Sequence, residues 1–313
     1  MGSSRYNIQF QKGLGLPEFI KLFGTEQKCQ ENLIKIKWKN GFRCRKCDYT
    51  HYSRFSRNGR EYFQCSDCQH QHSLTSYTLF HGSHLPLQKW YMAIYFISES
   101  KKSISSLELH RLINVNHKTA WLMLHKIMKV MTDEENGRKL KGRIEIDDAY
   151  LGGKRSGGKR GRGAAGKQPF IVAIQTSKNA GKNYPIFAKL TPIEAFKKDV
   201  VNQWAVKSIS KGSTIVSDGL PAFSGVDNLC SHEKHVASEM TEEDKQEHFR
   251  CFNTILSNIK TSLSGTFHSF NSAKNSELYL GAIMYRFNNR FDLSEIFSSL
   301  LEQAIFHPPV KYI

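Results

Sequence analysis

The chain has 313 residues, enough for two or three domains, and its 45 Lys and Arg outnumber its 28 Asp and Glu, giving a formal charge of +17. This excess favours a polyanionic partner. We expect a cytoplasmic protein, because the sequence offers neither an apolar run of about 18 residues to span a bilayer nor an N-terminal signal pattern. Seven cysteines, an odd number, argue against a complete disulfide framework.

The first part of the chain combines helices with paired cysteines. Residues 17–37 are predicted to form two short helices. Within residues 41–80, two Cys-x-x-Cys pairs have the spacing of a four-thiolate zinc site. Their ligands are Cys44, Cys47, Cys65 and Cys68. Four thiolates leave no open coordination position, so the sequence predicts a structural Zn2+, and the nearby His51, His70 and His72 are not needed as ligands.

The three remaining cysteines, Cys29, Cys230 and Cys251, lie singly in apolar segments. We expect them to pack as buried small hydrophobic residues.

A helical pattern follows over residues 87–131. A helix within 103–113, a turn at 114–116 and a helix from residue 117 are typical of a helix-turn-helix, whose second helix directs its first residues at base edges. Here those residues are His117, Lys118 and Thr119. The alternative is a helical hairpin that only packs its own core.

The segment 133–142 is charged and rich in turn formers, and we expect a domain boundary there. Beyond it, strands alternate with helices in the order of a ribonuclease-H-like fold with a mixed α/β sheet. Strands are expected at 143–151, 169–176, 184–190, 213–217 and 232–237, and helices at 193–207, 243–262 and 272–288. The predicted domains are therefore 1–82 with the zinc ribbon, 83–136 with the helical DNA-binding segment, and 140–313 with the catalytic fold.

Two aspartates are expected at strand ends of this sheet, Asp147 and Asp218. Asn253 and Lys260 follow on a helix, separated by about 700° of rotation and hence on nearly the same face. Strand-end carboxylates with an amide oxygen and an ammonium group predict a Mg2+ or Mn2+ site for phosphoryl transfer, with Asp147, Asp218 and Asn253 as ligands. Asp148 is predicted to lie outside this set.

Two alternatives stay open at the third ligand position. Glu239, Glu242 or Glu247 could replace Asn253, or Asn253 could be an ordinary surface amide.

The stretch 152–167 holds seven glycines and six basic residues and predicts a basic loop rather than a packed element. We expect it to contact a phosphate backbone, although a solvated linker is the simpler interpretation. The contacting side chains would be Lys154, Arg155, Lys159, Arg160 and Arg162.

Taken together, these motifs resemble a known family. They are Ile144 to Lys154, Ser217-Asp218-Gly219, Asn253 to Lys260, Gly265 to His268 and Tyr285 to Arg290. With the cysteine pairs, they make the chain similar to DDE transposases of bacterial insertion sequences, in the ISXO-type group with an N-terminal zinc ribbon.

The resemblance implies an integrase-like catalytic domain that cuts DNA at terminal inverted repeats and joins the 3′-hydroxyls to target DNA. Its three metal-binding positions fall on Asp147, Asp218 and Asn253, and its trailing lysine on Lys260. Asn253 departs from the Glu found in most DDE enzymes. The implied partners are double-stranded DNA at transposon ends and target, in a homodimer or larger assembly at the bacterial nucleoid. The alternatives are a DNA-binding regulator, an inactive transposase derivative and a nuclease for RNA hybrids.

Overall fold

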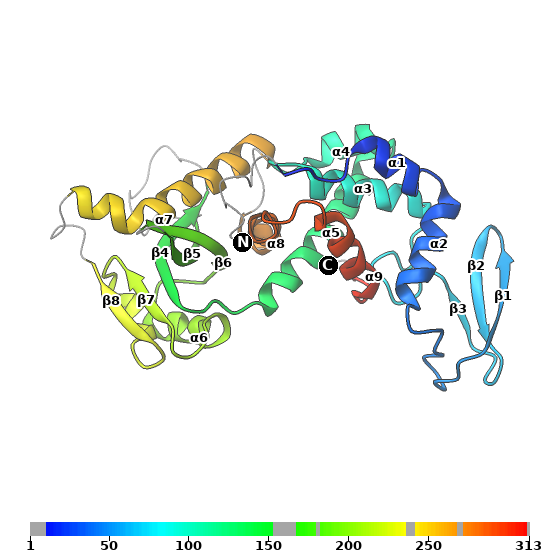
Figure 1. Ribbon diagram of the computed structural model, residues 1–313, viewed down its shortest axis with the longest axis horizontal. Helices are drawn as coiled ribbons and strands as arrows, with labels where there is room; N and C mark the ends of the chain where they lie inside the picture. Colours follow the sequence, from blue (N-terminus) through cyan, green and yellow to red (C-terminus); the bar gives the residue numbers. More distant parts are fainter. Residues whose placement is uncertain (1–10, 153–166, 180–181, 236–241, 268–271, 312–313) are drawn as a thin grey trace. The chain divides into compact units, whose positions relative to one another are not determined.

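The computed structural model describes residues 11–152, 167–179, 182–235, 242–267 and 272–311. The chain forms two compact units (Figure 1). One contains the chain up to Val130 together with the segment from Arg290 onward, and the other runs from Met131 to Asn289. Among the described helices, none combines the length and the apolar character needed to cross a membrane.

The first unit is built on helices α1 (Leu16–Phe23), α2 (Glu26–Lys37), α3 (Leu87–Glu99) and α9 (Ile296–Phe306). Phe19 of α1 stacks on Tyr95 of α3 with ring centroids 4.3 Å apart, and the ring of Phe297 in α9 meets Phe19 edge-on. Helix α9 was not predicted from the sequence. The segment from Arg290 onward had been assigned to the catalytic domain, but it packs with the N-terminal unit because its apolar helix buries Phe297 there. The three-domain division stays a prediction.

A three-stranded antiparallel sheet follows α2 in the chain. Its strands, in the spatial order β1-β2-β3, are β1 (Tyr52–Arg57), β2 (Arg60–Cys65) and β3 (Gln71–Ser73). The sequence Arg60-Glu61-Tyr62-Phe63-Gln64 predicts β2, whereas β1 and β3 were not expected. The sheet carries the second cysteine pair at the end of β2, next to the cluster of Trp38, Phe42 and Phe63.

The helix-turn-helix segment consists of α4 (Ser106–Ile113) and α5 (His117–Gly137). Asn114 ends α4 in the left-handed conformation at φ 49°, and the Asn116 side chain accepts a hydrogen bond from the Thr119 amide at the start of α5. Residues 133–137, expected in a turn-rich boundary, continue α5 instead. The carbonyls at its end are satisfied by the buried Lys189 ammonium, which donates to the carbonyl oxygens of residues 135, 136 and 138.

The second unit contains a five-stranded mixed sheet. Its spatial order is β6-β5-β4-β7-β8, in which β4 pairs antiparallel with β5 and parallel with β7. β5 and β6 are antiparallel, and β7 and β8 are parallel. The strands are β4 (Arg143–Leu151), β5 (Gln168–Asn179), β6 (Lys182–Pro192), β7 (Thr214–Ser217) and β8 (Ser231–Lys234). With α6 (Lys198–Ser208) between β6 and β7, this order is that of a ribonuclease-H-like fold, as predicted.

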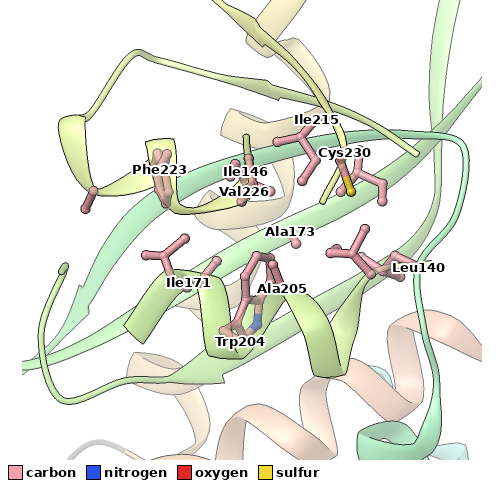
Figure 2. Close-up of a cluster of buried hydrophobic side chains, with 14 of the residues drawn as sticks. Leu140, Ile146, Ile171, Ala173, Trp204, Ala205, Ile215, Phe223, Val226 and Cys230 are labelled. Carbon is pink, nitrogen blue, oxygen red and sulfur yellow. The ribbon is translucent and has the colours of Figure 1, made fainter. Parts of the chain in front are cut away.

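Helices cover both faces of this sheet (Figure 1). On one face, Trp204 and Ala205 of α6 meet Ile146, Ile171 and other side chains of the strands in a buried apolar cluster (Figure 2). This cluster also includes the short 3-10 helix η2 (Pro221–Val226). On the other face runs α7 (Glu242–Ser262), which continues into a π-helical turn, η4 (Leu263–Phe267). Helix α8 (Ser272–Asn288) packs near β6.

Helix α8 covers the edge strand β6. The Asn288 side chain accepts a hydrogen bond from the Ala188 amide at 2.8 Å and donates to its carbonyl at 3.0 Å, so the amide group completes the unpaired edge of the strand. Asn288 also donates to the Glu135 carboxylate in α5 at 2.6 Å. Earlier in α8, Gly281 lies so close to Thr132 of α5 that any larger side chain at this position would collide with Thr132.

Candidate metal centres

The register of two parallel strands brings two distant aspartates together. Ile146 of β4 pairs with Ser217 of β7, and this is the last pair between the strands. The next residues along each strand are Asp147 and Asp218. Paired residues of parallel strands project from the same face, so Ile146 and Ser217 both point toward the core beneath α6. The aspartates that follow them therefore point to the opposite face, which α7 covers.

The two carboxylates form a compact acidic group with Asp148. One oxygen from each of Asp147, Asp148 and Asp218 lies within 4.8 Å of the others, and all three side chains are half-buried. Oxygens bound to one Mg2+ at about 2.1 Å lie at most about 4.2 Å apart, so small side-chain movements suffice to fit this group around an ion. The donor set of hard carboxylate oxygens suits Mg2+ or Mn2+.

The local backbone differs from the sequence prediction in one respect. The strand expected at 143–151 is confirmed, but Asp147 lies within it and not at its end, because the pairing of β4 with β5 extends to Leu151 and Gln168. Asp147 therefore lies at the end of the parallel pairing only. Asp148 is a strand residue rather than a turn residue, and its amide donates to Asp147 Oδ1 at 2.7 Å. The Asp-Asp dipeptide was the only sequence signal that Asp148 would join the group.

Asn253 and Lys260 lie on the helix that covers this face of the sheet. Helix α7 buries Phe252, Ile255 and Ile259, whereas Asn253 and Lys260 are both exposed on one flank of the helix. The expected common face is therefore present. The role of Asn253 as third metal ligand stays a prediction.

Several other predicted site residues cannot be placed. The basic-loop residues Lys154, Arg155, Lys159, Arg160 and Arg162 lie outside the described residues, as does Glu239. Glu242 and Glu247 belong to the first turns of α7, but their side chains are outside the described part of the chain, like that of Cys251.

The four paired cysteines converge on one point. One sulfur from each of Cys44, Cys47, Cys65 and Cys68 lies within 4.8 Å of the others. The Sγ atoms of Cys44 and Cys68 are 3.5 Å apart, as are those of Cys47 and Cys65. A tetrahedral Zn2+ with bonds of about 2.3 Å separates its sulfurs by about 3.8 Å, so the four residues fit a zinc ion with little adjustment.

His72 supports this cluster from the side. Its Nε2 atom lies 3.6 Å from Cys44 Sγ, and the ring is buried. Burial opposes ionisation of the Cys44 thiol, but hydrogen bonds from His72, from two backbone amides and from Cys68 outweigh it and lower the thiol pKa. His72 thus contacts a predicted ligand without belonging to the group of four.

The other lone cysteines behave as expected where they are described. Cys29 and Cys230 are both buried. Burial raises the pKa of each thiol above its ordinary value, which suppresses thiolate chemistry at these positions.

The predicted base-contacting residues are at the start of α5. His117 and Lys118 are exposed, and Thr119 is half-buried. His117 Nε2 lies 3.0 Å from Ser106 Oγ of α4, which ties the two helices together beside the turn. Trp121, one turn further on, is also exposed and lies 3.9 Å from the His125 ring. DNA contact by these residues stays a prediction.

Comparison with known proteins identifies two domains in this chain. Residues 139–288 match the ISXO2-like transposase domain, and residues 24–71 match a transposase zinc-ribbon domain. A curated relative is an uncharacterized protein in transposable element ISH50 of Halobacterium salinarum. It is 24% identical over 226 residues, which cover 66% of this chain and 72% of the relative.

Two solved structures show a weak similarity. They are the Mos1 mariner paired-end complex with Mn and the Mos1 transposase paired-end complex with left transposon end, at 11% and 12% identity. Each similarity covers 67% of this chain and 78% of the other, with TM-scores of 0.24 and 0.22. Scores this low do not indicate a shared function.

Proposed function

This chain belongs to the ISXO2-like transposases of insertion sequences, and we propose that it cuts DNA at the terminal inverted repeats of its element and transfers the freed strands to target DNA. The observation that carries this proposal is the acidic group at the end of the β4–β7 pairing, where carboxylate oxygens of Asp147 and Asp218 lie within 4.8 Å of each other. Strand β4 contributes Asp147 and Asp148, and Asp218 directly follows β7, so the group depends on the folded sheet.

In the proposed site, Asp147 and Asp218 hold Mg2+ or Mn2+, and Asn253 adds an amide oxygen. When bound, the metal supplies activation of the attacking oxygen and neutralisation of charge on the leaving oxygen. Lys260, on the same flank of α7 as Asn253, binds a DNA phosphate through its ammonium group. Because the Asn253 amide carries no charge, the metal it contacts is held less tightly than by a third carboxylate.

The N-terminal unit would supply the base contacts, and the basic loop of the second unit the phosphate contacts. The exposed His117 and Lys118, with Thr119, face the bases from the start of α5, and the basic residues of 154–162 contact phosphates. A Zn2+ ion on the four cysteines holds the ribbon. Two transposon ends must be paired for transposition, which favours a homodimer or a larger assembly acting at the nucleoid.

The test uses zinc-loaded, full-length protein and DNA that carries the ends of its own element. Metal-dependent nicking is expected, and Asp147→Ala and Asp218→Ala should abolish it while the shift of end DNA in a gel remains. Asp199→Ala is the matched control, because Asp199 is an exposed aspartate on α6 of the same unit. Normal cutting by both site variants would refute the mechanism.

A second candidate is a DNA-binding regulator or an inactive transposase derivative. It is favoured by the neutral, exposed Asn253 at the third metal position. Wild-type protein that binds end DNA without metal-dependent cleavage would support this candidate.

A further inference from the structure

The turn that carries Asp218 is backed by side chains on the opposite face of the sheet. Register pairs Ile215 of β7 with His232 of β8, so His232 projects on the side of the α6 core to which Ile215 belongs. Ser217, two residues after Ile215, projects from this face too. Asp218 alternates to the other face, so any influence of His232 on it must pass through Ser217 and the backbone.

The side chains of Asp227, His232 and Ser217 form a continuous chain of hydrogen bonds, here called the relay. His232 Nδ1 lies 2.5 Å from Asp227 Oδ1, and His232 Nε2 lies 2.8 Å from Ser217 Oγ. The Asp227 carboxylate accepts the Nδ1 proton, so Nε2 is left to accept the Ser217 hydroxyl. Lys234 Nζ, 3.2 Å from Asp227 Oδ2, holds the outer end of the relay. The hydrogen bond from His232 lowers the pKa of Asp227, which keeps the carboxylate charged.

The inner end of the relay reaches the backbone around Asp218. Ser217 Oγ accepts a hydrogen bond from the Gly219 amide at 3.4 Å, and Asp218 Oδ1 accepts one from the Leu220 amide at 3.1 Å. Gly219 adopts φ +83°, a conformation that favours glycine. The turn is therefore fixed on both sides of Asp218.

The order Asp–His–Ser is also that of hydrolase triads, but burial excludes this chemistry here. Ser217 is fully buried, and the His232 side chain is only 3% exposed, so a substrate cannot reach the serine oxygen. Asp227, at 40% side-chain exposure, is the only solvent-facing member. A buried relay that ends on a backbone turn can orient that turn.

We propose that Asp227, His232 and Ser217 are positioning residues that hold Asp218 in the orientation required to bind a divalent metal. The inference rests on the metal-binding role of Asp218 in the proposed function. Hydrogen-bonding partners behind metal ligands typically change metal affinity by about 10- to 100-fold. The loss of the relay should therefore weaken metal binding without removing a ligand.

The experiment measures Mn2+ binding by electron paramagnetic resonance of the free ion, using zinc-loaded, full-length protein. Ser217→Ala should raise the half-saturating Mn2+ concentration by about tenfold or more, and Asp227→Asn by a smaller factor. Val201→Ala is the matched control, because Val201 is a fully buried core residue of α6 outside the relay. It should lower the melting temperature and leave Mn2+ binding unchanged.

Asp218→Asn separates failure of this inference from failure of the proposed function. If Asp218→Asn weakens Mn2+ binding but Ser217→Ala and Asp227→Asn bind like wild type, the relay is only structural and the inference is overturned. If Asp218→Asn binds Mn2+ as tightly as wild type, both the proposed metal site and the positioning role of the relay are refuted. Should Ser217→Ala not fold, Asp227→Asn decides, because its position is partly exposed.

Discussion

Ile146 and Ser217 form the last pair between the parallel strands β4 and β7, and each is followed directly by an aspartate. The convergence of Asp147 and Asp218 is therefore a property of the strand register. A shift of one residue in this register would send one of the two carboxylates to the opposite face. The buried Ile144 and Ile146, which must face α6, fix the register against such a shift.

The same register distinguishes Asp147 from its neighbour Asp148. Alternation along β4 directs Asp147 toward the α7 face, together with Asp218. We expect Asp147→Asn to reduce the initial cleavage rate about 10³-fold, which corresponds to about 4 kcal/mol of transition-state stabilisation. Asp148→Asn should reduce the rate by no more than about tenfold. Cleavage of end DNA at saturating Mn2+ measures both. Equal reductions of the cleavage rate in the two variants would indicate that Asp148 contributes to metal binding as much as Asp147.

A carboxylate at position 253 should strengthen metal binding. Asn253→Glu restores a carboxylate on the exposed flank of α7, and we expect the half-saturating Mn2+ concentration for cleavage to fall by about tenfold, or 1.4 kcal/mol. Asn258→Glu adds the same charge at an exposed position about 140° further round the helix. A similar gain from Asn258→Glu would reduce the effect to general electrostatics, and no gain from Asn253→Glu would count against Asn253 as a ligand position.

Much of this fold could be predicted from the sequence. The strand-like run from Arg143 to Leu151 predicts β4 with its correct bounds, and the helical patterns of 243–262 and 272–288 predict α7 and α8 within a residue of their ends. Patterns of this kind are local, and the buried side chains that create them also decide the structure. The four cysteines were predictable because metal-ligand spacing is itself a sequence property.

Interactions between distant segments were the part that the sequence did not reveal. Helix α9 was not predicted because its apolar residues pack against α1 and α3, and the sequence does not show these distant partners. The predicted end of helix α5 came too early, because the charged residues after Asp133 suggest a turn. In the structure, Glu135 is buried and interacts with Arg138 and Asn288, so the helix continues. The relay behind Asp218 combines an exposed aspartate, a strand histidine and a strand serine, residues without a shared motif.

Removal of zinc should unfold the ribbon and leave the second unit intact. The ribbon has a small core around Phe63 and Phe42, and the four cysteines replace the packing that it lacks. After chelation, we expect fast hydrogen exchange in β1 to β3 and unchanged protection in β4, measured by mass spectrometry. Cys65→Ser should likewise release the zinc ion expected on the four cysteines, whereas Cys230→Ala should retain it. Zinc retained by Cys65→Ser, or loss of protection in β4, would contradict this prediction.

Glu99, at the end of α3, should make the stability of the first unit depend on pH. Its Oε1 atom is buried and has no hydrogen-bond partner among the described residues, and burial raises the pKa of its carboxyl to about 7. The unfolded chain releases this proton near pH 4.3, so the folded state binds more protons between about pH 4.3 and 7 and loses stability as the pH rises through that window. Glu99→Gln removes the charge. Its melting temperature should match that of wild type at pH 4.5 and exceed it at pH 8, as measured by calorimetry.

Glu18, an exposed carboxylate on α1 of the same unit, provides the control for Glu99. Solvent screens an exposed carboxylate, so Glu18→Gln should change the melting temperature by the same small amount at both pH values. A constant difference between Glu99→Gln and wild type from pH 4.5 to 8 would mean that the Glu99 carboxyl ionises at the same pH in the folded and unfolded chain. Burial would then impose no net penalty on the charge, since any such penalty must appear as a slope in the melting temperature across this window.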